Sequence, residues 1–144
     1  MKKKLIGVLL LSNLLFAGFI RDDGKGVVFD TTTHLMWQDS QDDVNGSKTW
    51  GEAIVYCENL EYASYDDWYL PNINELLTIV DIHQSDPAIN SHFVYKESYP
   101  PYWSSTASVD DSNYAFSVNF DIGSFGESSK TNQVNVRCVR RVVE

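Results

Sequence analysis

The sequence predicts a mixed α+β fold, because helix and strand patterns occupy different parts of the chain. Two helix-start signatures, at Thr49 and Asn72, lie in its first half. From Tyr102 onward the chain shows only strand patterns and turns. Early helices followed by a late antiparallel sheet are typical of the α+β class. With 43% hydrophobic residues the chain can build one domain with its own core, which we place at residues 24–142.

The N-terminus has the pattern of a secretory signal peptide. Lys2–Lys4 precede a nearly continuous apolar run, Leu5–Ile20, with small residues near its end. We expect residues 1–18 to be removed, so that the mature chain acts in the periplasm or outside a bacterial cell. The alternative is a retained membrane anchor, which is disfavoured because Ser12 and Asn13 interrupt the run.

The mature chain is expected to be strongly acidic. The sequence carries 11 basic and 20 acidic residues, and three of the basic ones lie in the leader, which leaves a net charge of −12. This charge disfavours nucleic acids, anionic membranes and sulfated polysaccharides as partners, because all three are bound through Lys and Arg. No later apolar run is long enough to insert into a membrane once the leader is cleaved.

Two cysteines in an exported chain predict a disulfide bond, here between Cys57 and Cys138. The alternatives are two buried thiols, or a nucleophilic cysteine, which pairing would consume. Two cysteines are too few for a zinc site, and the three histidines lack metal-ligand spacing. No G-x-S-x-G motif indicates a serine hydrolase, so we expect no enzyme.

The first half is predicted to hold a hairpin and two helices. After a polar turn at Arg21–Gly26, strand patterns at Val27–Phe29 and His34–Trp37 flank a threonine-rich turn. Thr49 begins a helix through a capping box, and Cys57 falls on its apolar stripe. A second capping arrangement starts another helix, and a long irregular segment with three prolines, 81–101, follows it. The residues expected on the inner face of the second helix are Ile73, Leu76, Leu77 and Val80.

The last third is predicted to be strand and turn. Tyr102–Ser105 forms one short strand. Large and small residues then alternate, which places Tyr114, Phe116, Val118 and Phe120 on the buried face of a second strand. The Gly- and Ser-rich segment Ile122–Asn132 is expected to form a turn region. Val134, Val136 and Cys138 are expected to point one way along a single final strand.

Four ordered stretches resemble a known family. They are FDTTTHLMWQ at Phe29–Gln38, TWGEAIVYCENL at Thr49–Leu60, DWYLPNINELLTIV at Asp67–Val80, and YWSST at Tyr102–Thr106 followed by Val136–Arg140. The set resembles the collagen-like-protein C-terminal domain family, long known as domain of unknown function 1566, over nearly the whole mature chain. The resemblance implies a C-type-lectin-like fold and an exported adhesion or ligand-binding module.

The sequence departs from that family in three ways. It has no Gly-x-y stalk, and its acidity disfavours a basic head that would bind glycosaminoglycans. Leu70–Asn72 and Trp103–Ser105 stand where calcium-dependent lectins carry their sugar-binding motifs. Calcium-dependent sugar binding of the usual kind is therefore not expected, and the four tryptophans are expected to be core residues.

The predicted binding residues lie in the late loops. Asn, Asp and aromatic side chains supply adaptable hydrogen bonds and ring contacts there, although any solvated loop has a similar composition. They are Asp110, Asp111, Asn113, Tyr114, Asn119, Asp121, Phe125, Lys130 and Asn132. A separate prediction is a Ca²⁺ site, whose alternative is a plain acidic loop without EF-hand order. Its residues would be Asp39, Asp42, Asp43 and Asn45.

The sequence thus predicts an exported, non-catalytic, adhesin-like or lectin-like domain that recognises a glycan or a protein through its late loops. The alternative is a structural or interaction subunit of a cell-envelope assembly, with no small ligand. Apart from Ca²⁺ we expect no cofactor, and a homo-oligomer is compatible with either function. An exposed aromatic residue between Asp110 and Asn132 would favour ligand binding.

Overall fold

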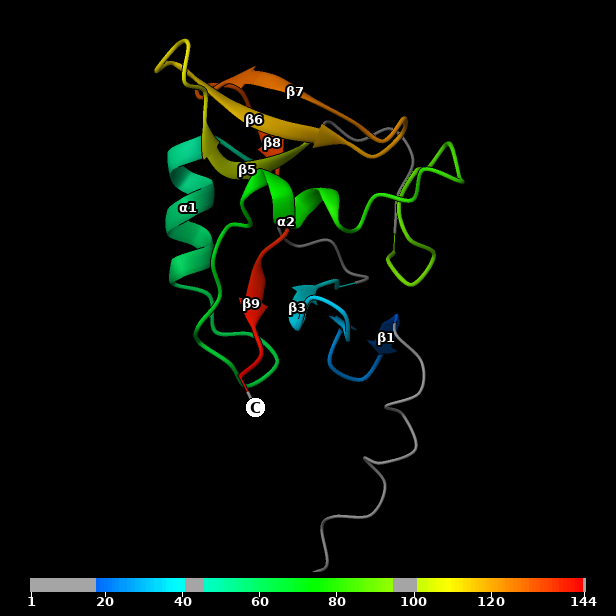
Figure 1. Cartoon of the computed structure of the whole chain (residues 1–144). Helices are drawn as coiled ribbons and strands as arrows, with labels where there is room; N and C mark the ends of the chain where they lie inside the picture. The colour runs from blue at the N-terminus through cyan, green and yellow to red at the C-terminus, as the bar shows by residue number, and fades with distance from the viewer. Residues whose placement is uncertain (1–17, 41–45, 95–100, 144) are drawn as a thin grey trace, which may run out of the picture.

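The computed structural model describes residues 18–40, 46–94 and 101–143 (Figure 1). In these ranges the chain forms two sheets, of strand order β1-β2-β3-β9 and β4-β8-β5-β6-β7, together with two helices. The predicted α+β class is confirmed. In the same ranges no helix is long and apolar enough to cross a membrane. The elements are β1 Phe19–Asp22, β2 Val27–Asp30, β3 Leu35–Gln38, β4 Ser47–Lys48, α1 Trp50–Glu58, α2 Ile73–Leu77, β5 Tyr102–Ala107, β6 Tyr114–Asn119, β7 Ser124–Ser129, β8 Val134–Asn135 and β9 Val139–Arg141.

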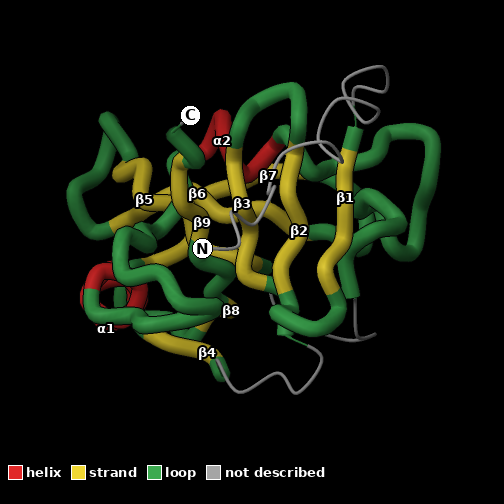
Figure 2. The backbone as a smooth tube through the Cα atoms, turned by 90° about the horizontal axis from the view of Figure 1, so that it is seen from below, coloured by secondary structure: helices red, strands yellow, loops and turns green. Residues whose placement is uncertain are grey.

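The four-stranded sheet joins the two ends of the described chain. The predicted β2–β3 hairpin is confirmed, and β9 pairs with β3 on its other side (Figure 2). The hairpin turn is fixed by Asp30, whose carboxylate accepts hydrogen bonds from Thr32 N at 2.8 Å and Thr33 Oγ1 at 2.7 Å. The predicted polar turn at 21–26 is wrong at its start, because Arg21 and Asp22 belong to β1, which extends the sheet by pairing with β2.

Both helices begin where their capping residues predict. Thr49 N donates to Glu52 Oε2 at 2.9 Å, and Glu75 N donates to Asn72 Oδ1 at 2.8 Å. On α1 the buried residues include Cys57, as expected.

The second helix is shorter than its apolar pattern suggests. It ends at Leu77, so Val80 does not extend its inner face but forms a β-bridge with Ile89. Leu76 is buried, while Ile73 and Leu77 are half-buried. The segment after α2 thus packs back against the loop that follows it.

The five-stranded sheet lies between two apolar clusters. Trp103 and Ala115 pack with Ala53 and Cys57 of α1 in one cluster. Val118 and Phe120 pack with Leu76 of α2 in the other. Because Ala115 and Val118 point to opposite sides of β6, the central part of this sheet is covered on both faces.

This two-sided burial overturns one prediction about β6. Ala115 and Ser117 are buried, whereas Tyr114 is exposed and Phe116 is half-buried. The large residues of the alternation therefore enter the core only at Val118 and beyond, where α2 covers them. A pattern of large and small residues indicates a single buried face only when the other face is open to solvent.

Two further strand predictions are wrong. Residues 122–132 are not all turn, because Ser124–Ser129 forms β7 and pairs with β6 without a break in register. The single final strand is in fact two, β8 and β9, which belong to different sheets. The predicted disulfide is confirmed, and Cys138 lies in the crossing between them, joined to Cys57 with a Cα–Cα distance of 5.5 Å.

Candidate ligand-binding surface

The predicted binding residues fall at opposite ends of the β6–β7 hairpin. Each strand has six residues, so the ends lie roughly 16 Å apart at the usual rise of a strand. Asn119 and Asp121 lie at the β6–β7 turn, and Phe125 lies within β7. These residues therefore do not form one compact site (Figure 1). Those near the β5–β6 loop, at the other end, are Asp110, Asp111, Asn113, Tyr114, Lys130 and Asn132.

Polar groups of the β5–β6 loop mostly bind one another. Asp111 Oδ1 accepts hydrogen bonds from Asn113 N at 2.8 Å and from Asn113 Nδ2 at 3.0 Å. Ser108 Oγ accepts from Asp110 N at 3.2 Å and from Asp111 N at 3.3 Å. These are local turn interactions that hold the loop in one shape.

Lys130 fastens this loop to α1. Its ammonium donates to Ser112 O at 2.7 Å and lies 4.2 Å from the ring centre of Trp50. Trp50 Nε1 in turn donates to Ser104 O at 2.9 Å. Lys130 therefore acts in the structure as a support of the hairpin.

Three of the four tryptophans, Trp37, Trp68 and Trp103, are buried as expected, whereas Trp50 is half-buried.

The β6–β7 turn is fixed by the segment that follows α2. Asp86 N donates to Asp121 O at 2.9 Å, and Asn119 Oδ1 accepts from Asp121 N at 2.8 Å. Gly123 has a φ of +69°, and a Cβ at this position would lie 3.0 Å from side-chain atoms of Val80 and Ala88. This end of the hairpin is therefore tightly packed.

Gly123→Ala is expected to lower the free energy of unfolding by about 2 kcal/mol, since left-handed backbone and crowding both disfavour a Cβ there. Gly126→Ala is the matched control, because its added Cβ would meet no atom within 4 Å and its φ is not positive. Urea unfolding followed by circular dichroism measures both variants. Equal stability of the two would contradict the packing described for Gly123.

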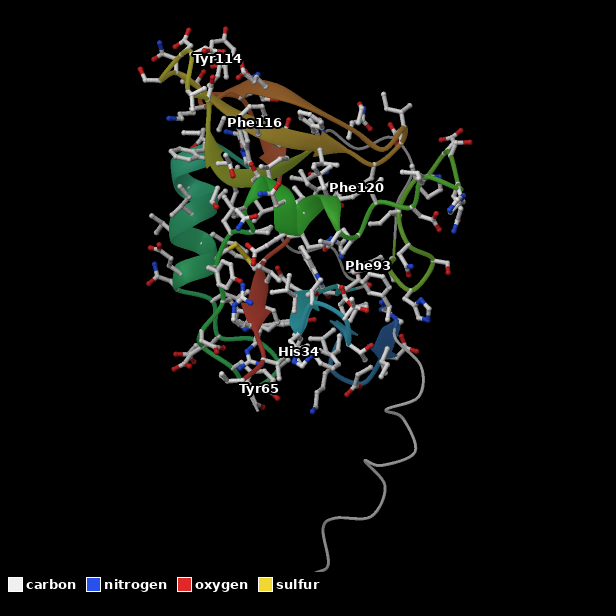
Figure 3. The ribbon with its side chains drawn as sticks, viewed as in Figure 1. His34, Tyr65, Phe93, Tyr114, Phe116 and Phe120 are labelled. Atoms are coloured by element: carbon white, nitrogen blue, oxygen red, sulfur yellow. A yellow bond between two sulfur atoms is a disulfide. The ribbon has the colours of Figure 1, made fainter. Side chains whose placement is uncertain are left out.

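An aromatic row on the hairpin remains open to solvent. It consists of Tyr114, Phe116 and Phe125, which share one face because Phe125 pairs with Val118 in the register. The rings of Phe116 and Phe125 lie 6.2 Å apart, and Tyr114 and Phe125 are 38% and 59% exposed. Figure 3 places Tyr114 and Phe116 on the upper sheet, far from His34 of the lower one.

The sequence prediction missed Phe116, because the alternation assigned it to the core. The available signal was the run of small residues on the other face of β6, Ala115 and Ser117, which can pack beneath the large Trp103. Glu127 pairs with Phe116 across the hairpin and places a carboxylate beside the row. The surface therefore combines aromatic rings with one negative charge.

Of the four residues predicted to bind Ca²⁺, the structure describes only Asp39. Asp42, Asp43 and Asn45 lie outside the described residues. Asp39 is 3% exposed, and its two carboxylate oxygens accept hydrogen bonds from Arg21 and Arg137. Within the described ranges no group of three His, Cys, Asp or Glu residues could hold a metal ion. The structure therefore gives Asp39 a role in an ion-pair network.

A second ion pair joins β9 to the loop before α2. Arg140 Nη2 donates to Asp67 Oδ2 at 2.9 Å, and its guanidinium lies 3.8 Å from the ring centre of Tyr65. The hydrogen bond to Arg140 holds the pKa of Asp67 below its usual value. Burial, together with a hydrogen bond to Glu75, raises the pKa of Tyr69 to about 12. These groups join elements of the fold, and Tyr65 lies at the opposite end of the molecule from Tyr114 (Figure 3).

The chain matches the family model of the Lcl C-terminal domain over residues 26–140. No curated protein matches the chain.

Proposed function

This chain belongs to the Lcl C-terminal domain family, and we propose that it is an exported, non-catalytic domain that binds a glycan or a protein. The observation that carries the proposal is the aromatic row of Tyr114, Phe116 and Phe125. Large aromatic side chains left open on a folded surface are typical contact points for ligands. The C-type-lectin-like fold and an adhesin-like role are parts of the same proposal.

The rigidity of the hairpin supports recognition. The β5–β6 loop is held by hydrogen bonds among its own residues and by Lys130, which also contacts α1. The β6–β7 turn is hydrogen-bonded to the segment after α2. A ligand that contacts the row therefore meets a surface that is already ordered, so little conformational entropy is lost on binding. The short exposed polar groups at both ends can add hydrogen bonds at the rim of such a contact.

Export is supported by the leader pattern and by the Cys57–Cys138 disulfide, a bond that persists in oxidising compartments. The strong net negative charge suits a solvated surface outside the cytoplasm and points to neutral or basic ligands. The alternative function, a structural subunit of an envelope assembly, would require the aromatic row to be covered permanently by another subunit.

The test compares Phe125→Ala with Val55→Ala on arrays of purified glycans and of bacterial surface proteins. Val55 is a matched control, because it is 56% exposed but lies on α1, away from the hairpin. Loss of the most exposed ring of the row is expected to weaken binding by about tenfold or more, whereas Val55→Ala should bind like the unchanged protein. Equal binding by all three proteins would refute this surface as the recognition site.

A further inference from the structure

The outer edge of β7 has no partner strand in the described part of the chain. β7 is the last strand of its sheet and pairs with β6 from Ser124↔Asn119 to Ser129↔Tyr114. In an edge strand, alternate backbone N–H and C=O groups point away from the neighbouring strand. Residues 124–127 are also exposed, so within the described part of the chain this edge is open along most of its length.

This edge lacks most of the usual protection against added strands. Proteins blunt their edges with short strands, bulges, proline or charged side chains, lysine above all, and of these β7 carries only the charge of Glu127. The other edge strands, β1, β4 and β9, have four, two and three residues, whereas β7 has six. β7 contains no proline or lysine and pairs with β6 in one continuous register. It is therefore the edge best suited to accept another strand.

The side chains beside the edge specify the chemistry of a partner. Phe125 and Glu127 lie on one face of β7, and both are exposed. From residue 101 to 132 the chain carries four acidic residues and a single basic one, Lys130, which binds Ser112 O and covers Trp50. On the other face Gly126 has open space where a side chain would begin. A basic strand with a bulky central residue would complement this surface.

We propose that β7 accepts an extended segment of a partner protein as an additional antiparallel strand, with a basic side chain opposite Glu127 and an apolar one opposite Phe125. A bulky side chain opposite Gly126 would cover the space on the other face. The proposal rests on the proposed function and selects a protein ligand over a glycan, because the unpaired backbone edge runs along the aromatic row. Antiparallel pairing is chosen since it is the more stable arrangement per residue.

The probes are synthetic eight-residue peptides built on Ser-Thr-Ser-Lys-Phe-Ile-Thr-Ser, with the serine and threonine positions varied. In this register Lys faces Glu127, Phe faces Gly126 and Ile faces Phe125. Fluorescence anisotropy measures binding of each labelled peptide to the folded protein. We expect binding that weakens by about tenfold or more when the peptide Lys is changed to Glu.

Two matched comparisons test the geometry. The variant Glu127→Lys changes only an exposed residue and is expected to reverse the preference, so that the Glu peptide binds more tightly than the Lys peptide. N-methylation of the peptide amides that face β7 is expected to abolish binding, whereas methylation of the other amides should leave it nearly unchanged. The second comparison requires no change in the protein, so it cannot fail through misfolding.

Several results would overturn the proposal. The proposal fails if no peptide binds at concentrations up to millimolar, or if Glu127→Lys does not reverse the preference between the Lys and Glu peptides. It also fails if N-methylation of the amides that face β7 leaves binding unchanged. Sedimentation would also overturn it by showing a dimer of this chain that Glu127→Lys dissociates, because β7 would then already be paired with a second copy.

Other results separate the two proposals. If a glycan binds and Phe125→Ala abolishes that binding, while no peptide binds, the added strand is refuted but the proposed function is retained. If Phe125→Ala affects neither class of ligand, both proposals fail.

Discussion

Changing Cys57 and Cys138 together to alanine is expected to lower the free energy of unfolding by about 4 kcal/mol. The bond spans 81 positions, so breaking it releases a long loop in the unfolded chain. The chain-entropy model gives about 4 kcal/mol for a loop of that length, and a typical domain has only about 5–15 kcal/mol of stability in total. The loss would therefore remove a large part of the stability.

Urea unfolding of the chain without its predicted leader, followed by far-UV circular dichroism, measures this loss. The unchanged protein in excess reductant is the control, and it should match the alanine variant within about 1 kcal/mol, the scatter expected from replacing two buried thiols by methyl groups. If reduction leaves the midpoint of unfolding unchanged, the bond does not stabilise the domain. In that case the disulfide also loses its weight as support for export.

The features that the sequence predicted well depend on local signals. Both capping boxes, at Thr49 and Asn72, were recognisable because the two partners lie three positions apart in one turn. The Cys57–Cys138 bond was predictable because the chain offers only one pair of cysteines. In each case the number of alternatives was small.

The errors arise where tertiary contacts decide. β7 is rich in Ser and Gly, residues with weak strand preference, and it is a strand because β6 lies beside it. Phe116 lies outside the core because α1 and α2 cover different parts of the sheet. The sequence of β6 alone does not indicate which face of the strand each helix covers. The candidate binding surface was therefore predictable in its position along the chain but not in its residues.

The role of Asp39 is another feature that the sequence alone could not predict. In the sequence it is one of several acidic residues in a polar loop, but in the structure it is buried between two arginines. Its Oδ2 also accepts a hydrogen bond from Val94 N at 2.9 Å, and Arg137 Nη1 donates to Gln38 O at 3.0 Å. The network thus joins β1, the end of β3, the segment near residue 94 and the crossing from β8 to β9.

Asp39→Asn is expected to lower the free energy of unfolding by about 3 kcal/mol or more, because it leaves the guanidinium of Arg137 buried without an opposite charge. Arg137 is only 5% exposed, so water cannot replace the lost carboxylate. Burial by itself lowers the pKa of Arg137, but Tyr102 and Asp39 raise it above its ordinary value, so the charge persists at any usual pH. Urea unfolding at neutral pH measures the loss.

Two further variants distinguish the cost of an uncompensated buried charge from the cost of losing an ion pair in general. Asp23→Asn removes the other partner of Arg21, but Asp23 is exposed, and the change should cost about 0–1 kcal/mol. Asp39→Leu combined with Arg137→Met removes both buried charges and should be more stable than Asp39→Asn alone, because no uncompensated charge remains in the core. If Asp39→Asn costs no more than Asp23→Asn, the network does not stabilise the junction.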